Sequence, residues 1–192
     1  METLLSVCLG IGLSAACGFR IFVPLLVMSI ASFSGHLHLA PGFAWIGTYP
    51  ALISFSVATC LEIAGYYIPW VDHLLDTIAT PAAVVAGTVI TASLATDMSP
   101  LLRWTLAVIA GGGVAGAVQG VTVATRATST LATAGLANPV VATAELAGSV
   151  ATSILALLAP LVVAVLVLVL LAVFGRKLVS YFRRLQPVPR GA

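Results

Sequence analysis

Long stretches without a charged side chain limit what this chain can fold into more than any other feature. The run at residues 158–174, LAPLVVAVLVLVLLAVF, is apolar throughout. Similar runs recur along the chain, and only 7% of its 192 residues are charged, against about 25% in a soluble globular domain. Since about 20 apolar residues span a bilayer as a helix, the sequence predicts an integral membrane protein whose main partner is the lipid bilayer.

The apolar runs are continuous, and this predicts helices. The strands of an outer-membrane barrel alternate polar and apolar residues in segments of about ten, and the chain lacks this alternation. We therefore expect a protein of the all-α class. Its architecture is predicted to be a polytopic transmembrane helical bundle with about six crossings.

The first apolar run carries a single charge in its interior. Residues 3–33 would form a helix of about 46 Å, which exceeds the roughly 30 Å thickness of the hydrocarbon core. Gly18 and Pro24 bracket Arg20, the one charged residue of this run. Because proline removes a hydrogen bond from a helix, we expect a break or kink beside Arg20.

Polar segments divide the rest of the chain into further spans. Residues 35–50 are rich in Gly, Pro and His, and Trp45 and Tyr49 are typical anchors of a membrane interface. Residues 69–77, PWVDHLLDT, are interpreted as a second interface. Residues 140–174 barely accommodate two crossings and a turn, so we expect one short or re-entrant element there. The number of crossings in that region stays open.

The charges are distributed unevenly along the chain. Residues 1–175 contain three basic and six acidic residues, whereas residues 176–192 contain five basic ones. Because Lys and Arg beside a membrane helix stay cytoplasmic, residues 183–192 are expected to form a cytoplasmic tail of a bacterial inner-membrane protein. This tail fits contact with anionic lipid better than binding to nucleic acid or a protein partner, so we expect no nucleic-acid binding.

The two halves of the chain contain similar motifs in the same order. EIAG at 62–65 matches ELAG at 145–148. Small residues four positions apart let membrane helices approach closely, and they occur as Gly10, Ser14 and Gly18 and again as Gly112, Gly116 and Gly120. We therefore predict two three-helix membrane repeats, residues 1–96 and 97–182, each with a broken or over-long first helix. Three crossings in each repeat require the second to be inverted, as in many secondary transporters, and place residue 1 on the cytoplasmic side.

Three segments carry a resemblance to a known family. They are GFRIFVPLL at 18–26, EIAGYYIPWVDHLLDTIATP at 62–81 and ATRATSTLATAGLANPVVATAE at 124–145. In this order they resemble an uncharacterised bacterial integral-membrane family, domain of unknown function 4126, over nearly the whole chain. The resemblance implies a polytopic membrane protein without an assigned substrate, and it supplies no catalytic residues.

Four charged residues lie deep in apolar sequence: Arg20, Glu62, Arg126 and Glu145. An unpaired charge at the bilayer centre costs about 2.5–3.5 kcal/mol on insertion scales, so these residues must be paired, neutralised or hydrated. One Arg and one Glu in each half predict pairing, with Arg20 inside the bundle and facing a Glu. Two interpretations stay open, namely structural ion pairs that fix the packing and a polar pathway for an ion or small solute.

Two uncharged polar residues join this candidate pathway. Gln119 lies in the segment that holds Arg126, and Asn138 precedes Pro139. Asn138 could begin a half-helix whose N-terminus points at an anion, or it could act as a plain N-cap.

Asp72, His73 and Asp76 form a second candidate site, at the predicted interface. Asp72 and Asp76 share a helix face at positions i and i+4, and together with His73 they could bind a metal. The pair His36 and His38 is a weaker candidate of the same kind. Neither set has enough ligands, so the sequence predicts ordinary interfacial polar residues, with no metal and no cofactor.

The sequence therefore favours a small transporter or channel and not an enzyme. The principal alternative is a non-transporting membrane scaffold or assembly partner with structural buried ion pairs. A membrane enzyme that uses a metal at Asp72 and Asp76 is a third interpretation. A homodimer would enlarge the polar interior, but the sequence leaves open the oligomeric state, the substrate and its charge, the coupling ion and the direction of transport.

Overall fold

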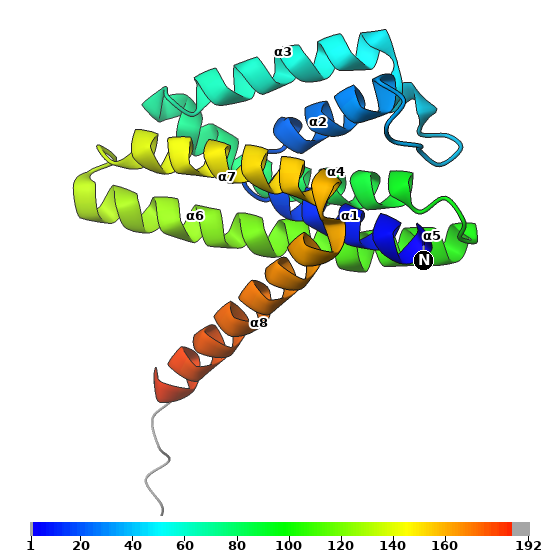
Figure 1. Cartoon of the computed structure of the whole chain (residues 1–192). Coiled ribbons are helices and arrows are strands. Elements are labelled where there is room, and N and C mark those ends of the chain that lie inside the picture. Colours follow the sequence, from blue (N-terminus) through cyan, green and yellow to red (C-terminus); the bar gives the residue numbers. More distant parts are fainter. Residues whose placement is uncertain (1, 186–192) are drawn as a thin grey trace, which may run out of the picture.

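The computed structural model describes residues 2–185, and every regular element in this range is helical. The elements are α1 Glu2–Cys17, α2 Phe22–Phe33, η1 Ala44–Gly47, α3 Tyr49–Gly65, α4 Pro69–Leu94, α5 Pro100–Leu106, η2 Ala107–Gly112, α6 Gly113–Thr133, α7 Asn138–Leu158 and α8 Pro160–Leu185. Figure 1 shows α1 to α7 lying along one common direction, whereas α8 leaves the bundle.

Within residues 2–185, four helical stretches are long and apolar enough to cross a membrane. They are Leu74–Leu94, Pro100–Thr133, Asn138–Leu158 and Pro160–Lys177, while α1, α2 and α3 are shorter apolar helices. The protein is therefore an all-helical membrane protein, as its composition predicts. The predicted tail at residues 183–192 lies largely outside the described residues.

The expectation of a short or re-entrant element within residues 140–174 is wrong. α7 begins before this run and α8 continues beyond it, so both helices have the length of a full span. Ala159 alone separates them. Pro160 then occupies the first position of α8, where a missing N–H costs no helical hydrogen bond, and this allows so short a connection.

The first apolar run folds into a helical hairpin. α1 and α2 are joined by residues 18–21 and run in opposite directions (Figure 1). Near the end of α1, Ser14 Oγ donates to the Gly87 carbonyl in the interior of α4 at 2.9 Å. In α2, Met28 lies beside Ser93 at the far end of α4, with 3.5 Å between Sδ and Oγ. The predicted break is confirmed, and it is a complete reversal of the chain.

The corresponding segment of the second half is over-long but unbroken. α5, η2 and α6 form one continuous helical stretch, Pro100–Thr133. η2 is π-helical, which is a common way for a helix to absorb an extra residue. Gly111 at the end of η2 lies so close to α4 that a Cβ built on it would be 2.4 Å from the Gly87 carbonyl oxygen.

This close approach makes Gly111 sensitive to a single methyl group. We expect Gly111→Ala to lower the free energy of unfolding by about 1–3 kcal/mol, because the α4 backbone cannot move aside without repacking. Gly120→Ala is the matched control, since a Cβ at Gly120 meets nothing within 4 Å and alanine favours the helix. Unfolding in mixed detergent micelles measures both, and equal stability of the two variants would contradict the packing argument.

Most of the predicted small packing residues do lie in helix contacts. A Cβ on Gly18 would be 2.4 Å from Val118 Cβ, and Gly10, Gly112 and Gly116 also face neighbouring helices. Gly120 is the exception, and its predicted packing role is wrong. It lies on an exposed face of α6, which the spacing of small residues alone does not reveal.

The first helices of the two predicted repeats run in the same direction. Gly10 and Gly111 both lie against Thr91, and further along both helices Gly18 lies against Val118. By contrast, α3 runs opposite to α7, and α4 runs opposite to α8 (Figure 1). The first helices of the two predicted repeats, α1 and the stretch from α5 to α6, are therefore not inverted relative to each other.

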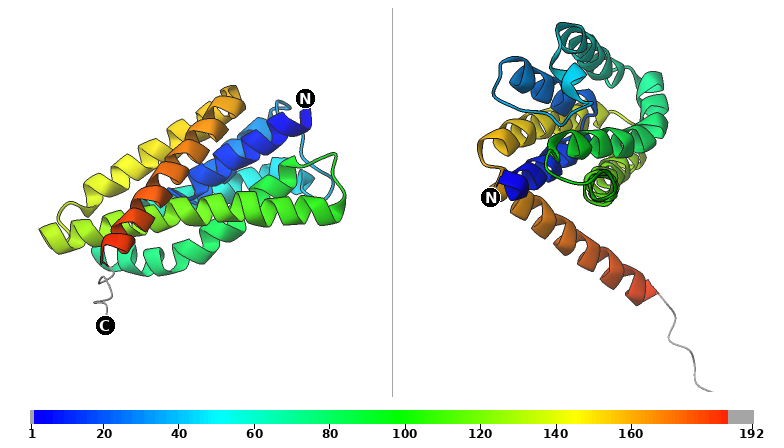
Figure 2. Two further views of the ribbon diagram at one scale, coloured as in Figure 1. Left: turned by 90° about the horizontal axis from the view of Figure 1, so that it is seen from below. Right: turned by 90° about the vertical axis from the view of Figure 1, so that its right-hand side faces the viewer.

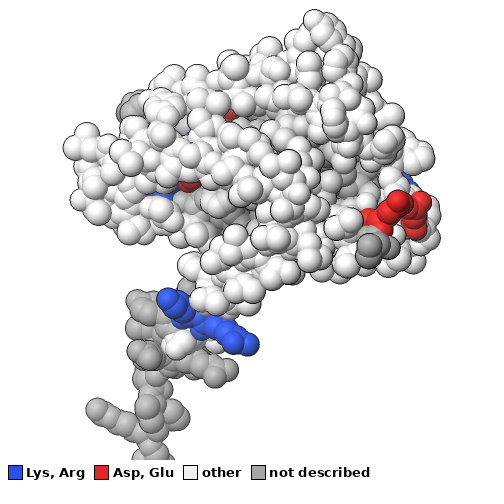
Figure 3. All heavy atoms as spheres, in the orientation of Figure 1, with Lys and Arg blue, Asp and Glu red and all other residues white. Residues whose placement is uncertain are grey.

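α8 packs only its first part on the bundle. Val163 and Ala164 are buried, whereas Leu168, Val169 and Leu170 are exposed. Figure 2 shows the remainder of the helix projecting away from the other helices. In Figure 3 most of the basic atoms gather on α8, most of the acidic atoms gather at the right-hand edge of the bundle, and only small charged spots lie between them.

Candidate functional site

Six charged side chains converge where the turn of the α1–α2 hairpin meets α3, α4, α6 and α7. We call them the charged cluster: Arg20, Glu62, Asp72, Asp76, Arg126 and Glu145. Five of them are buried, with exposed fractions of 1–7%, and the side chain of Asp76 is 21% exposed. Charges that would be costly singly inside a membrane are thus gathered at one place.

Arg126 lies at the centre of the charged cluster. Its Nε donates to both carboxylate oxygens of Glu145, at 3.0 and 3.1 Å, and Nη2 also donates to Glu145. Its Nη1 donates to Asp72, and Asp76 Oδ1 lies 3.8 Å from Nε. The planar guanidinium presents its N–H groups as a fork, so one side chain serves two carboxylates.

Arg20 reaches the same carboxylate from the hairpin turn. Its Nη2 donates to the Ala142 carbonyl at 2.8 Å and lies 3.5 Å from Glu145 Oε2. Glu145 therefore bridges the two arginines. Nε and Nη1 of Arg20 have no hydrogen-bond partner among the described residues. The Glu that Arg20 faces thus belongs to the other half of the chain.

Tyr66 holds the two arginines together through its ring. The guanidinium carbons of Arg20 and Arg126 lie 3.8 and 4.1 Å from the ring centroid. A cation near an aromatic face gains about 2 kcal/mol or more when it is desolvated, and Tyr66 is 6% exposed. Sequence reasoning missed this residue, because one tyrosine beside a predicted interface gives no signal of a buried role.

Backbone N–H groups, and not an arginine, bind the carboxylate of Glu62 among the described residues. Its two carboxylate oxygens accept hydrogen bonds from the backbone N–H groups of Ile21 and Phe22, at 2.7 and 3.0 Å. These N–H groups begin α2, and the first N–H groups of a helix lack partners within it. The carboxylate also complements the positive end of the helix dipole, so Glu62 fastens the hairpin turn to α3.

Asp72 and Asp76 belong to the charged cluster and not to a separate interface. α4 begins at Pro69, so both residues are helical and project toward α6. Asp72 is 2% exposed, so its side chain lies inside the bundle and not on its surface. Their spacing of four residues, which places them on one helix face, was the signal that could have linked them to Arg126. The side chain of His73 lies outside the described residues.

Asn138 connects Asp72 to α6. Its Nδ2 donates to Asp72 Oδ2 at 3.2 Å and lies 3.1 Å from Thr130 Oγ1. Asn138 is the first residue of α7, and Ala137 precedes it as the N-cap, so the predicted capping role of the Asn138 side chain is wrong. Gln119 is also buried, two turns before Arg126 on α6. Its backbone carbonyl accepts a hydrogen bond from the Thr122 hydroxyl.

A cavity of about 350 Å³ borders the charged cluster. Asp72, Asp76, Arg126, Thr130 and Asn138 supply its polar lining. Asp76 is the carboxylate of the cluster with the greatest exposure. A small ligand in this cavity would therefore reach the carboxylate of Asp76 more readily than the buried side chains of Asp72 and Arg126.

The predicted metal candidates do not come together as ligands. Within residues 2–185, no group of three or more His, Cys, Asp or Glu side chains that the structure describes could hold a metal ion. Asp72 is already engaged by Arg126 and Asn138. His36 lies at the surface, 3.0 Å from Ser34 Oγ.

Comparison with known proteins assigns the chain to a family. No curated protein and no solved structure matches it. Residues 7–179 match the family described as "Domain of unknown function (DUF4126)", a description that names no activity, enzymatic or other. The match includes all six residues of the charged cluster and most of every helix described above. The chain therefore belongs to the DUF4126 family of unknown function.

Proposed function

We propose that the protein is a small membrane transporter that moves a cation, including the proton, through the charged cluster. The observation that carries this proposal is the composition of the cluster, which contains four carboxylates and two guanidinium groups. Two carboxylates balance the two arginines. The other two leave excess negative charge in a low-dielectric interior, which favours binding of a proton or a cation.

Exposure distinguishes one carboxylate of the charged cluster from the other three. Glu145 and Asp72 are held by arginine, and Glu62 is held by the N-terminus of α2. Asp76 is the most exposed of the four, with 21% of its side chain accessible, and it lines the cavity. We assign Asp76 as the carboxylate that exchanges its proton or cation during transport.

The proposed topology has five crossings and one re-entrant hairpin. α3, α4, the stretch from α5 to α6, α7 and α8 alternate in direction (Figure 1), and each crosses the membrane. α1 and α2 enter from one side and reverse at residues 18–21. This replaces the six crossings expected from the sequence. Backbone that is irregular at membrane depth must be buried in protein or line a polar cavity, and Glu62 meets that requirement at this turn.

The basic end of α8 sets the proposed orientation. Arg176 and Lys177 follow its apolar part, so this end faces the cytoplasm of a bacterial inner membrane. Five crossings then place the start of α1 on the opposite side. The cavity beside Asp76 lies toward the cytoplasmic end of the bundle, since α6 ends and α7 begins there.

A non-transporting scaffold is the second candidate function. The observation that favours it is the extent of internal pairing, because Arg126 is engaged by both Glu145 and Asp72. Buried ion pairs of this kind can serve only to specify packing. A homodimer is compatible with both functions and is tested by the mass of the purified protein in detergent.

Transport is tested by charge movement in proteoliposomes on a solid-supported membrane. Jumps in proton, sodium and potassium concentration are applied to the wild type, Asp76→Asn and Asp97→Asn. We expect the wild type and Asp97→Asn to carry a current for one of these ions and Asp76→Asn to lose it. Asp97 is the matched control because it is exposed, and the same change there leaves the cluster intact.

Two outcomes would overturn the proposal. Equal currents in the wild type and Asp76→Asn would remove Asp76 from the pathway. Silence of the folded wild type across the panel would favour the scaffold. Gel filtration of each variant establishes that the amide substitution has preserved the fold.

A further inference from the structure

An apolar groove of about 420 Å³ lies between α8 and the bundle. The hairpin turn, α6, α7 and α8 contribute to it through Phe19, Val118, Leu155, Leu166 and Leu170. It is separate from the cavity beside Asp76, with which it shares no lining residue. The groove exists because α8 diverges from the bundle after its first turns (Figure 2).

Among the described residues that line this groove, Lys177 alone is charged, and it lies at one end. Lys177 is the last residue of the membrane-spanning stretch Pro160–Lys177. A lysine at this position extends its ammonium toward the lipid headgroups while its stem stays on apolar surface. Basic positions between membrane helices on the cytoplasmic side are suited to anionic headgroups.

The size of the groove favours a lipid chain over a second protein helix. A helix with side chains is about 10–12 Å in diameter, so a segment as long as Val163–Lys177 would occupy on the order of 1,600 Å³. The groove offers about a quarter of that volume. A flexible hydrocarbon chain has no backbone polar groups to satisfy and can follow such a narrow space.

We propose that this groove binds an anionic phospholipid. One acyl chain lies in the groove, between α8 and the side chains of Phe19 and Val118 on the bundle. The phosphate contacts the Lys177 ammonium. This assignment is independent of the transport function, because it rests on a different surface and a different charge.

A tryptophan reporter in the groove tests the proposal. The full chain with Leu155→Trp is reconstituted into phosphatidylcholine vesicles that contain a small, equal fraction of either brominated phosphatidylglycerol or brominated phosphatidylcholine. The fluorescence of the three native tryptophans, measured without the reporter, is subtracted. We expect the brominated anionic lipid to quench the reporter more strongly, and Lys177→Gln to lower its apparent association about fivefold.

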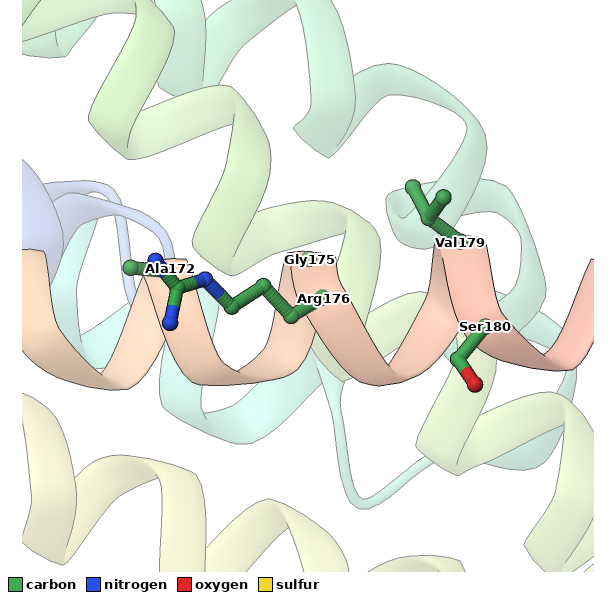
Figure 4. Close-up of a pocket in the computed structure, with 5 residues that line it drawn as sticks. All are labelled: Ala172, Gly175, Arg176, Val179 and Ser180. Carbon is green, nitrogen blue, oxygen red and sulfur yellow. The ribbon is translucent and has the colours of Figure 1, made fainter.

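Arg176→Gln is the matched control for the loss of one positive charge. Arg176 lines a shallow hollow whose described lining residues all lie on α8, with Ala172, Gly175, Val179 and Ser180. Figure 4 shows its side chain lying back along α8 toward Ala172. Because Arg176 does not line the groove, we expect this variant to keep most of the preference for the anionic lipid.

The remaining outcomes each overturn a stated part of the proposal. Equal quenching by the two brominated lipids in the protein with the reporter would exclude an anionic-lipid site. Equal loss in Lys177→Gln and Arg176→Gln would show that the charges act only through the general surface potential. An unchanged association in Lys177→Gln would exclude Lys177 as the headgroup contact. Gel filtration of every variant distinguishes these results from unfolding.

Discussion

Arg126→Met is expected to destabilise the protein more than any other single substitution, by about 3–5 kcal/mol or more. Arg126 donates to Glu145 and Asp72 and lies 3.8 Å from Asp76. Methionine fills a similar volume but leaves these carboxylates buried without their cation, so that they must take up protons or draw in water. Unfolding in mixed detergent micelles, followed by helical circular dichroism, measures the loss.

Arg103→Met provides the control, because Arg103 lies in the same long helical stretch and forms no ion pair with a described acidic residue. Arg103→Met should lower the free energy of unfolding by well under half as much as Arg126→Met does. Arg126→Lys should fall between the two, since lysine keeps the charge but cannot reproduce the forked contacts. Wild-type stability of Arg126→Met would contradict the central role of this residue.

The pairing of Arg126 with Glu145 also predicts non-additivity. Glu145→Gln alone leaves Arg20 and Arg126 without their shared carboxylate. In the double variant Arg126→Met/Glu145→Gln, the second substitution removes a charge that the first has stranded. The combined loss should therefore be smaller than the sum of the single losses, as expected for residues in direct contact.

Sequence reasoning found the buried charges because they interrupt apolar runs. A charge in such a run has few acceptable positions in a membrane protein, so Arg20, Glu62, Arg126 and Glu145 could be selected without a structure. The all-helical fold and the break beside Arg20 follow from the same physics. The match to the family spans nearly the whole chain, as the resemblance implied.

The partners of these charges depend on the fold and could not be inferred from the sequence. Asp72 follows Pro69 and Trp70 in a segment that resembles an interface, and only the start of α4 at Pro69 turns it inward. Arg20 pairs with Glu145 at a point where the chain reverses, at residues 18–21. A simple kink there would instead lead α2 away from α1. Local composition does not distinguish a reversal from a kink.

Glu62→Ala is expected to loosen the hairpin turn, with an effect that a native cysteine can report. Glu62 accepts the N–H groups of Ile21 and Phe22. Without it, two partly buried donors lose their acceptor, at up to about 1–3 kcal/mol for each. Cys17 is fully buried beside this turn, with its Sγ 3.6 Å from the Ile21 carbonyl oxygen, so it becomes accessible only when the turn opens.

Maleimide labelling of Cys17 measures this opening in a chain that carries Cys8→Ala and Cys60→Ala. We expect Glu62→Ala to raise the labelling rate at least about tenfold, because each 1.4 kcal/mol changes an opening equilibrium tenfold. Glu62→Gln should have a smaller effect, since its amide oxygen can still accept one N–H. Glu2→Ala, which removes an exposed carboxylate, should leave the rate unchanged. If Glu62→Ala also left it unchanged, the turn would be held by the packing of Gly18 against α6, and Glu62 would be free to act in the cation pathway instead.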